Sequence, residues 1–377
     1  MRRVYALQET DYVNEWFGNL NCRVTIPLFK PNNKIPTIKS YVVQPKKTIK
    51  TIRIPISLRG RKVTAVGLLD HFIYLMVNFF LLPVSLLHDT VIFFTPTFFT
   101  TIILPVFKLL RKNVYIICVD PQLALYYTYK SKGGVLLRFY WKLSNKLEIN
   151  SVRMADKVFV VSSYLRKKYL KYNKNVVLTP NGADYFSIKK IRARKHDKNF
   201  TIAYFGSIDK WRGVDLLVKA FKIVKTKNKN VKLLILGGGV EEENIRKMCS
   251  DDKNIFISGY IQHKKAISYC KDSDILVAPF RRDPILSRTS SIKVFEYIAC
   301  GVPIIITKTG EHAKIVGDLG VGLLSKATPQ DLAKKISVMI NNKKLYMSIK
   351  SNLKLKSDIV DFKNTRKPFF EEFENCR

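Results

Sequence analysis

A regular alternation of short β-branched runs with helical patterns, between residues 200 and 307, constrains the fold most strongly. The runs that predict strands are "FTIAYFG", "VKLLILGGG", "NIFISGYI", "DILVAPF" and "VPIIIT". Apolar residues at helical spacing separate them, for example in "GVDLLVKAFKIVKT" and "SIKVFEYIAC". Strand and helix repeated in this order predict a parallel sheet that helices cover on both faces.

The same rhythm begins earlier, near Asp89, with the strand-like runs "DTVIFFTP", "NVYIICVDP", "DKVFVVSS" and "NVVLTPNG". A chain of 377 residues is long enough for two domains that each bury a core. We therefore expect an α/β protein with two lobes, residues 1–182 and 183–357. A terminal helix at about 358–377 is expected to pack back on the first lobe.

The chain is strongly basic, with a formal net charge of +37. Residues 1–180 hold 28 Lys and Arg against 8 Asp and Glu, and residues 181–377 hold 38 against 21. Both halves are basic, so the charge does not belong to a tail. Nucleotide bias in the gene can account for part of the excess. The functional interpretation is an anionic partner, either lipid headgroups or nucleic acid.

Binding to nucleic acid would need aromatic side chains interleaved with cations on one surface. The phenylalanines of the predicted strands and helices are instead expected in the core: Phe93, Phe94, Phe98, Phe99, Phe205 and Phe256. Lipid is therefore the preferred anionic partner, and nucleic acid is not expected.

The cysteines show neither CxxC spacing nor a nearby pair of histidines, and several lie in apolar runs. We interpret all six as reduced core residues of a cytosolic protein, without a disulfide framework or a zinc site. They are Cys22, Cys118, Cys249, Cys270, Cys300 and Cys376. The start of the chain, "MRRVYALQETDYVNEWF", has no apolar stretch of signal-peptide length, so secretion is not expected.

One apolar segment, "HFIYLMVNFFLLPVSLL" at residues 71–87, approaches the length of a membrane span. Asn78, Pro83 and Ser85 interrupt it. We expect a helix that is buried or lies at a membrane interface. A transmembrane span, and a re-entrant hairpin formed with residues 91–110, remain alternatives.

The stretch "SSIKVFEYIACGVPIIIT" combines a helix start with an isolated acid, Glu296. Ser290 or Ser291 is expected to cap the first turn of this helix, where an anion such as phosphate can also bind. Lys293 lies one turn before Glu296, so the two residues form either a structural ion pair or a ligand site. In a ligand site, Lys293 would contact a diphosphate and Glu296 a pair of sugar hydroxyls.

A second polar turn, "YFGSIDKWRGVDLL", follows the strand that ends at Gly206. Its cations, Lys210 and Arg212, are either solvated or directed at the polyanion that the Ser290 helix start would bind. Both turns are expected at the carboxyl edge of the same sheet, where open α/β sheets bind ligands. The "LGGG" run lacks GxGxxG spacing and indicates a tight turn.

Together these segments resemble the carboxyl-terminal domain of retaining glycosyltransferases of the family 4 type, which have the GT-B fold of two Rossmann-like domains facing a cleft. The matching pieces include "MADKVFVVSSYLRKKYL", "LTPNGAD", "YFGSIDKWRGVDLLVKAF", "YCKDSDILVAPF" and "SSIKVFEYIACGVPIIIT". The resemblance covers residues 150–325 well and extends with a weaker match over residues 89–150, and it rests on the order of the motifs.

The resemblance implies roles for individual residues. Glu296 corresponds to the second glutamate of the E-x7-E signature, which contacts the nucleotide ribose. Arg212 and Lys293 correspond to the cations on the donor diphosphate and are the candidate catalytic residues, together with Asp120. The remaining expected donor-binding residues are Gly206, Ser207, Lys210, Gly259, Tyr260, Ser290, Ser291 and Ile292.

The sequence also departs from the family pattern. Arg288 stands where the first glutamate of E-x7-E is expected, and Ser207 where an arginine usually follows the opening glycine. No glycine precedes Gly18, so the Gly-Gly loop after the first strand is missing. Asp120 is the nearest polar residue to the position of an expected histidine, although it also suits a strand-end turn before Pro121.

These features predict a hexosyl-type glycosyltransferase that uses a nucleotide-diphosphate sugar. We expect it to require no metal and no other cofactor. Fixed cations would stabilise the leaving diphosphate, and that phosphate could accept the acceptor's proton, so retention needs no strong protein base. We expect a lipid-linked or cell-surface glycan acceptor and a cytoplasmic protein peripheral to an anionic membrane. The alternatives are a GT-B epimerase, a basic nucleic-acid-binding protein and an inactive scaffold.

Overall fold

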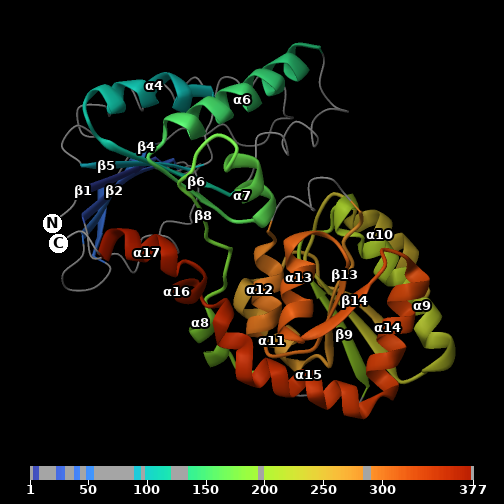
Figure 1. The fold of residues 1–377 in the computed structure, drawn as a ribbon. Coiled ribbons are helices and arrows are strands. Elements are labelled where there is room, and N and C mark those ends of the chain that lie inside the picture. The colour runs from blue at the N-terminus through green and yellow to red at the C-terminus, as the bar shows by residue number, and fades with distance from the viewer. Residues whose placement is uncertain are drawn as a thin grey trace. The chain divides into compact units, whose positions relative to one another are not determined.

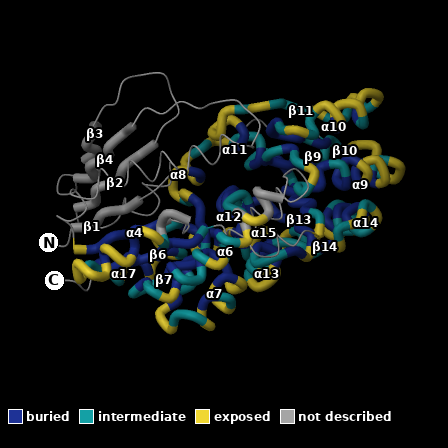
Figure 2. The backbone as a smooth tube through the Cα atoms, turned by 90° about the horizontal axis from the view of Figure 1, so that it is seen from above, coloured by how far each residue is buried: buried dark blue, intermediate teal, exposed yellow. Residues whose placement is uncertain are grey.

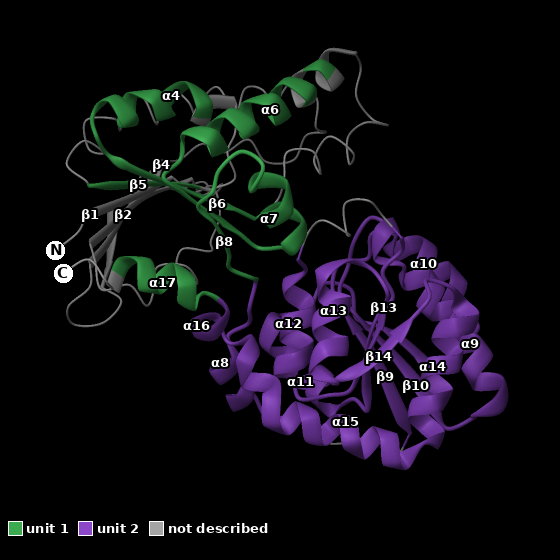
Figure 3. Ribbon diagram, in the orientation of Figure 1, with its two compact units in different colours: residues 1–180, 366–377 green, residues 181–365 purple. Residues whose placement is uncertain are grey.

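The computed structural model describes residues 3–7, 23–29, 38–42, 48–54, 89–94, 98–119, 135–193, 199–282 and 290–374. Asp120, Arg288 and the apolar segment 71–87 lie outside these stretches, as do Cys22 and Cys376. The chain divides into two compact units (Figure 3). Unit 1 comprises residues 1–180 and 366–377, and unit 2 comprises residues 181–365.

Unit 1 is built on an eight-stranded sheet in the order β3-β4-β2-β1-β5-β6-β7-β8 (Figure 1). Neighbouring strands are parallel except for β3 and β4, which are antiparallel. The strands are β1 (Arg3–Leu7), β2 (Arg23–Phe29), β3 (Ile38–Val42), β4 (Thr48–Ile54), β5 (Thr90–Phe94), β6 (Asn113–Cys118), β7 (Lys157–Val160) and β8 (Val176–Leu178).

Helices cover both faces of this sheet, which explains why β6 and β7 are buried almost continuously. In Figure 1, α4 (Phe98–Leu109) and α6 (Val135–Met154) lie on one face and α17 (Lys367–Glu374) on the other. The ring of Phe369 in α17 lies edge-on to that of Phe159, with centroids 5.0 Å apart. Helix α7 (Ser163–Tyr169) directly follows β7.

Unit 2 contains a six-stranded, wholly parallel sheet in the order β11-β10-β9-β12-β13-β14. The strands are β9 (Phe200–Phe205), β10 (Val231–Leu236), β11 (Ile255–Ile257), β12 (Ile275–Ala278), β13 (Ile304–Thr307) and β14 (Gly322–Ser325). Strands β12 and β13 are buried along their whole length, and Figure 2 shows buried backbone around β9 and β13 in the interior of unit 2. The predicted α/β fold with parallel sheets is therefore confirmed.

The helical segments of unit 2 connect these strands and complete its surface. They are α8 (Tyr185–Lys190), η1 (Lys210–Arg212), α9 (Val214–Lys227), α10 (Glu242–Cys249), α11 (His263–Asp272), α12 (Ile292–Ala299), α13 (Gly310–Leu319), α14 (Pro329–Asn341), α15 (Lys343–Lys356), η2 (Ser357–Val360) and α16 (Phe362–Thr365). The stretch from residue 357 to 365 thus belongs to unit 2, where Ala183 N–H donates to the carbonyl of Val360. Within the region predicted as a terminal helix, α17 lies in unit 1.

The strand order of unit 2 creates a topological switch point between β9 and β12. From β9 the chain adds β10 and β11 on one side, and it then crosses back to add β12, β13 and β14 on the other. Two connections leave this point in opposite directions, one through η1 and one through α12. The crevice outside the carboxyl ends of such strands is where open α/β sheets bind ligands.

The burial of individual side chains agrees with some expectations and corrects one. Phe93 and Phe205 are buried core residues, whereas the prediction for Phe256 was wrong because its side chain is 49% exposed. Phe256 lies on β11, an edge strand of the sheet, so nothing need cover its outer face. The side chains of Phe94, Phe98 and Phe99 are not among those that the structure describes. All four cysteines described by the structure are buried: Cys118, Cys249, Cys270 and Cys300.

Candidate functional site

Two glycines bring the carboxyl-end loops of unit 2 into close contact. Gly213 has a φ of 69°, and a Cβ there would lie 2.1 Å from the carbonyl oxygen of Pro279. Gly237 has a φ of 142°, and its Cβ would lie 2.0 Å from the carbonyl oxygen of Gly206. Only glycine permits such approaches, so η1 packs directly against the loop that follows β12.

Arg212, at the end of η1, is a cation held in place mainly by aromatic rings. Its guanidinium carbon lies 3.8 Å from the centroid of the Trp211 ring and 5.5 Å from that of Phe280. Its Nη1 donates to Oγ of Ser291 at 3.3 Å. Burial lowers the pKa of Arg212, although the group stays charged at neutral pH. No carboxylate among the described residues forms an ion pair with it.

The other predicted residues of this loop have different surroundings. Ser207 Oγ donates to Asp209 Oδ2 at 2.6 Å, which fixes the turn after Gly206. Lys210 is exposed, and its carbonyl oxygen accepts from Nε of Arg281 at 3.1 Å. Arg281 also pairs with Asp215. These hydrogen bonds and the ion pair stabilise the loop without involving the guanidinium of Arg212.

The start of α12 does not follow the expected capping pattern. Ser291 is the N-cap residue, but its side chain makes no cap hydrogen bond. Its Oγ accepts from Arg212 instead, and its backbone N–H donates to Nδ1 of His312 at 3.3 Å. Ser290 is buried, with its carbonyl oxygen accepting from Asn181 Nδ2 at 2.6 Å. The prediction that a serine side chain caps this helix was therefore wrong.

Further along α12, Glu296 is buried and contacts the side chains of Lys293 and His263. Its Oε2 lies 3.0 Å from Nζ of Lys293, and its Oε1 lies 2.7 Å from Nε2 of His263. Burial raises the pKa of Glu296, but the hydrogen bond with His263 and the charge of Lys293 outweigh that effect and lower it overall. The ion pair of Lys293 with Glu296, one of the two alternatives for these residues, is present. Each carboxylate oxygen retains a second lone pair, so the pairing leaves acceptor capacity for a hydroxyl.

Lys293 is shared between this carboxylate and an aromatic face. Its Nζ lies 4.0 Å from the centroid of the Phe205 ring, at the end of β9. Tyr297 fastens α12 to the same strand end, because its hydroxyl accepts from the N–H of Phe205 and donates to the Phe205 carbonyl. Ile292, also predicted to line the site, is half-buried at the first position of the helix. The strand end and the helix therefore form one rigid corner.

Sequence reasoning missed His263, Thr309 and His312. His312 is fully buried on α13, where its ring lies 5.1 Å from that of Phe280. Burial, followed by the positive charge of Arg212, lowers the pKa of His312 to about 4. The available signal was the polar run "KTGEH" after the strand "VPIIIT". Its importance depends on β13 lying beside β12, which periodicity does not reveal.

Several buried polar atoms on this edge lack a hydrogen-bond partner among the described residues. They come from three adjacent strands of the sheet, β9, β12 and β13, through the loops that follow them. The atoms are Nε of Arg212, Oγ of Ser290, Oγ1 of Thr309 and Nε2 of His312. Buried polar groups are normally hydrogen-bonded, so this cluster is suited to a ligand that is rich in acceptor oxygens.

Gly259 and Tyr260 lie on the same edge but apart from this cluster. They follow β11, on the far side of β10 from the switch point. Gly259 forms an isolated bridge with Gly237. Tyr260 is 86% exposed, and a Cβ on Gly238 would come within 2.8 Å of its ring. The structure therefore places these two residues beside the glycine-rich turn and away from Arg212.

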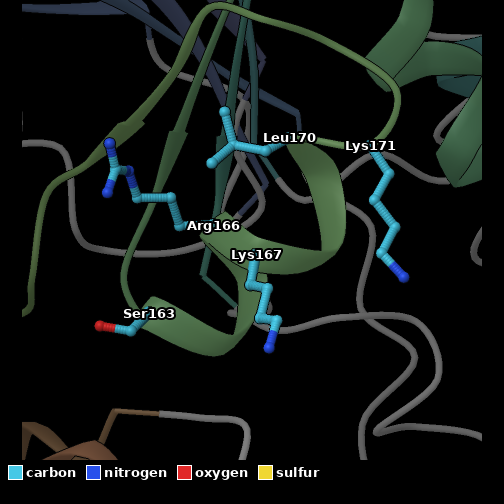
Figure 4. A pocket seen from close by; sticks show the side chains of 5 residues that line it. All are labelled: Ser163, Arg166, Lys167, Leu170 and Lys171. Carbon is cyan, nitrogen blue, oxygen red and sulfur yellow. The ribbon is translucent and has the colours of Figure 1, made fainter.

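Unit 1 contributes a separate basic hollow of about 400 Å³ on the exposed face of α7 (Figure 4). Its lining residues are Ser163, Arg166, Lys167, Leu170 and Lys171. The cations of this lining form no ion pair with a described carboxylate, whereas the neighbouring Lys168 pairs with Glu148 at 2.6 Å. The hollow was not predicted from the sequence, where these cations appear as an ordinary polar helix face.

Comparison with known proteins identifies the domain that carries the candidate site. Residues 186–356 match the family model described as "Glycosyl transferases group 1". The resemblance to glycosyltransferases of this group is thereby confirmed for that region. Membership of family 4 and retention of configuration stay predictions.

Several curated relatives match part of the chain, and two of them are described here. An uncharacterised glycosyltransferase of Methanocaldococcus jannaschii, MJ1178, is 29% identical over 225 residues, which cover 59% of this chain and 58% of the relative. The capsular polysaccharide biosynthesis glycosyltransferase CapM of Staphylococcus aureus is 26% identical over 242 residues, or 59% and 61% of the two chains. The match thus spans about three fifths of the length of each relative.

Solved structures resemble the whole chain. Sucrose-phosphate synthase (tll1590) from Thermosynechococcus elongatus has a TM-score of 0.72 at 14% identity, with 100% of this chain and 98% of that one covered. Anabaena Alr3699/HepE, solved in complex with UDP-glucose, has a TM-score of 0.69 at 12% identity and full coverage of both chains. These likenesses show the fold, and the predicted GT-B class with two Rossmann-like sheets is confirmed.

Proposed function

We propose that this protein, which carries a group 1 glycosyltransferase domain at residues 186–356, is a hexosyl-type glycosyltransferase. In this proposal it moves a sugar from a nucleotide-diphosphate sugar to a lipid-linked or cell-surface glycan, with retention of configuration. The main support is the set of buried, unpartnered polar atoms beside Arg212 at the switch point. A diphosphate supplies the acceptor oxygens and the negative charge that this cluster lacks.

The donor would occupy the corner between β9 and α12. Its diphosphate would lie against Arg212, Lys293 and the serines at the start of α12, where first-turn amides and the helix dipole favour an anion. Glu296 would accept hydrogen bonds from the ribose hydroxyls, since its lowered pKa keeps it ionised. The nucleobase would lie over the stretch that contains Gly259 and Tyr260.

The opening loop, with Gly206, Ser207 and Lys210, would border the sugar and the phosphates. Cleavage of the sugar–phosphate bond leaves negative charge on the diphosphate, which Arg212 and Lys293 would stabilise in the transition state. The departing phosphate oxygen would take the proton of the attacking hydroxyl, so no protein base is required. Asp120 remains our candidate polar group on the acceptor side, and no metal or further cofactor enters this scheme.

The acceptor is proposed to be anionic or attached to an anionic lipid. The hollow on α7, with Arg166, Lys167 and Lys171, offers a cluster of cations at the carboxyl end of β7. Exposed cations of this kind bind phosphate groups without demanding one fixed geometry. We therefore assign the acceptor's negatively charged part to this hollow.

We further propose that the protein is cytoplasmic and docks on the membrane surface through α4. One face of this helix packs in the core of unit 1, while the opposite face exposes apolar side chains at helical spacing: Ile102, Val106, Leu109 and Leu110. Lys108, Arg111 and Lys112 lie at its carboxyl end, and residues 98–112 contain no acid. Apolar contact combined with basic charge favours anionic bilayers.

Among the described residues, no helix is both long enough and apolar enough to cross a membrane. Flotation with vesicles tests the docking proposal. The double variant Ile102→Asn/Leu109→Asn should lose binding to anionic vesicles. The matched control, Ile223→Asn/Leu355→Asn, removes exposed apolar residues from unit 2 and should bind as the wild type does. Absence of the wild type from both anionic and neutral vesicles would contradict docking.

The transferase proposal itself is tested by a panel of nucleotide sugars. At least one should raise the melting temperature, because a ligand that binds only the folded state stabilises it. The stabilising donor should then be consumed when membrane extract supplies acceptors, with an anomeric product that retains the donor's configuration. Epimer formation without an acceptor would favour the epimerase alternative, and no stabilisation by any donor would favour an inactive scaffold.

A further inference from the structure

His312 lies beside the start of α12 and Arg212, although it does not belong to the expected motif. It lies on α13, after β13, and its side chain is fully buried. Ser291 bridges His312 and Arg212, since its N–H donates to His312 Nδ1 while its Oγ accepts from Arg212 Nη1. The ring of Phe280 is near both residues, 5.1 Å from the imidazole and 5.5 Å from the guanidinium. His312 therefore lies within the Arg212 cluster.

These contacts fix the tautomer of the imidazole. Because Ser291 N–H donates to Nδ1, that nitrogen must carry a lone pair and not a proton. The burial of the ring and the charge of Arg212 keep it neutral. A neutral imidazole has one protonated nitrogen, so the proton is on Nε2. Nε2–H is consequently an obligatory hydrogen-bond donor.

This donor has no acceptor among the described residues. A buried N–H without a partner is unfavourable, and it becomes favourable when a ligand supplies an oxygen. A neutral donor also differs from a lysine or arginine at this place, because it adds a hydrogen bond beside Arg212 without adding a second positive charge.

We propose that His312 is a ligand of the donor's diphosphate, with Nε2–H donating to a phosphate oxygen while Nδ1 holds the start of α12. This inference rests on the proposed function for the identity of the natural ligand. It adds a residue of α13 to a site otherwise formed by η1 and α12.

Two substitutions of His312 distinguish the role of Nδ1 from that of Nε2. His312→Asn places an amide near the position of Nδ1, so it keeps an acceptor for Ser291 N–H but loses the donor at Nε2. His312→Gln reaches the position of Nε2 with an amide N–H but loses the acceptor at Nδ1. Calorimetric titration with inorganic pyrophosphate and with UDP measures both variants against the wild type, and melting curves verify that each is folded.

A hydrogen bond to a charged group predicts a Kd about tenfold to a hundredfold higher for His312→Asn with both ligands. His312→Gln should stay within about threefold of the wild type, on the same basis. Normal binding by His312→Asn with weak binding by His312→Gln would overturn the proposal, because it would assign His312 only to anchoring α12. Equal binding by all three proteins, or no binding of pyrophosphate by the wild type, would also overturn it.

The two proposals fail in distinguishable ways. If the wild type binds pyrophosphate in a His312-dependent manner but binds no nucleotide sugar, the anion site stands and the transferase proposal fails. Nitrogen-15 NMR of the histidine rings gives an independent readout. The resonances that vanish in His312→Asn should report protonated Nε2 and unprotonated Nδ1, and pyrophosphate should shift the Nε2–H proton. An Nδ1-protonated ring would contradict the assignment.

Discussion

Strand β9 in unit 2 and strand β7 in unit 1 are each followed by cations that form no ion pair with a described carboxylate, and the surroundings of these cations differ. In unit 2, Arg212 is packed against aromatic rings, beside buried groups that have no hydrogen-bond partner among the described residues. In unit 1, Arg166 and Lys167 are exposed on α7, and the exposed Lys171 lies just past the end of that helix. Salt screens exposed charges strongly and buried charges little. We therefore expect unit 2 to bind one small polyanion in a fixed geometry. We expect the cations on and after α7 to bind a larger anionic partner in variable geometries and with a strong dependence on salt.

The sharpest contrast between the two regions should come from Arg212. Arg212→Met keeps a long side chain over the rings but removes the charge, and it should lower kcat/KM about a hundredfold or more. The matched control is Arg153→Met, which removes an exposed arginine that lies over the ring of Tyr172. Steady-state kinetics with the preferred nucleotide sugar measures both. Equal activities would contradict the assignment of Arg212 to the diphosphate.

The burial of His312 should make the stability of the folded protein depend on pH. The pKa of His312 is about 4 in the folded protein and 6.5 when unperturbed. Between these values the unfolded chain binds a proton that the folded one does not, so folding stability falls as pH drops from about 6.5 to 4. The loss attributable to His312 approaches about 3 kcal/mol. Urea unfolding measured at a series of pH values should show that His312→Asn lacks this loss of stability. If the free energy of unfolding of His312→Asn depends on pH as steeply as that of the wild type, the burial of a neutral ring is contradicted.

The ion pair between buried Glu296 and half-buried Lys293 allows a test that distinguishes a role in binding from a role in stability. Glu296→Gln should weaken nucleotide-sugar binding about tenfold, since a carboxylate binds ribose hydroxyls better than an amide does. It should also cost about 1–3 kcal/mol of stability, because it removes the charge that pairs with Lys293 and weakens the hydrogen bond with His263. Glu243→Gln, which breaks the exposed pair with Lys247, should change neither quantity. A loss of stability without a loss of affinity would make Glu296 purely structural.

The smallest effect should come from the exposed cations of α7. Replacing Arg166, Lys167 and Lys171 together by Gln should weaken binding to anionic acceptor vesicles severalfold to tenfold at low salt. The difference in vesicle binding between this variant and the wild type should vanish near 0.5 M salt, because salt screens exposed charges strongly at about that concentration. Nucleotide-sugar affinity should not change. Reduced nucleotide binding in this variant would remove the distinction between the two regions.

The sequence predicted the general architecture because parallel sheets leave a strong local signal. Strands buried on both faces read as apolar runs, and helices between them show their own period, as in β12 and α12. Glu296 and Lys293 could be proposed as site residues because they are one turn apart in one helix. Arg212 could be proposed because a polar turn after a strand end is visible in the local sequence.

Other features depended on strand order, which one sequence does not reveal. His312 and Thr309 reach the site because β13 lies beside β12, and His263 reaches Glu296 from a different helix. Phe256 was placed wrongly because an edge strand and a central strand have similar patterns. Ser291 does not cap α12 because Arg212 and His312, both distant in sequence, use its hydroxyl and its N–H.

A crystal structure of the protein with its preferred nucleotide sugar tests the central claim most directly. We predict that the diphosphate lies at the start of α12, with its oxygens within hydrogen-bond reach, about 3 Å, of the Arg212 guanidinium and of His312 Nε2. The ribose should contact Glu296. A diphosphate bound elsewhere, such as in the hollow on α7, would contradict the account.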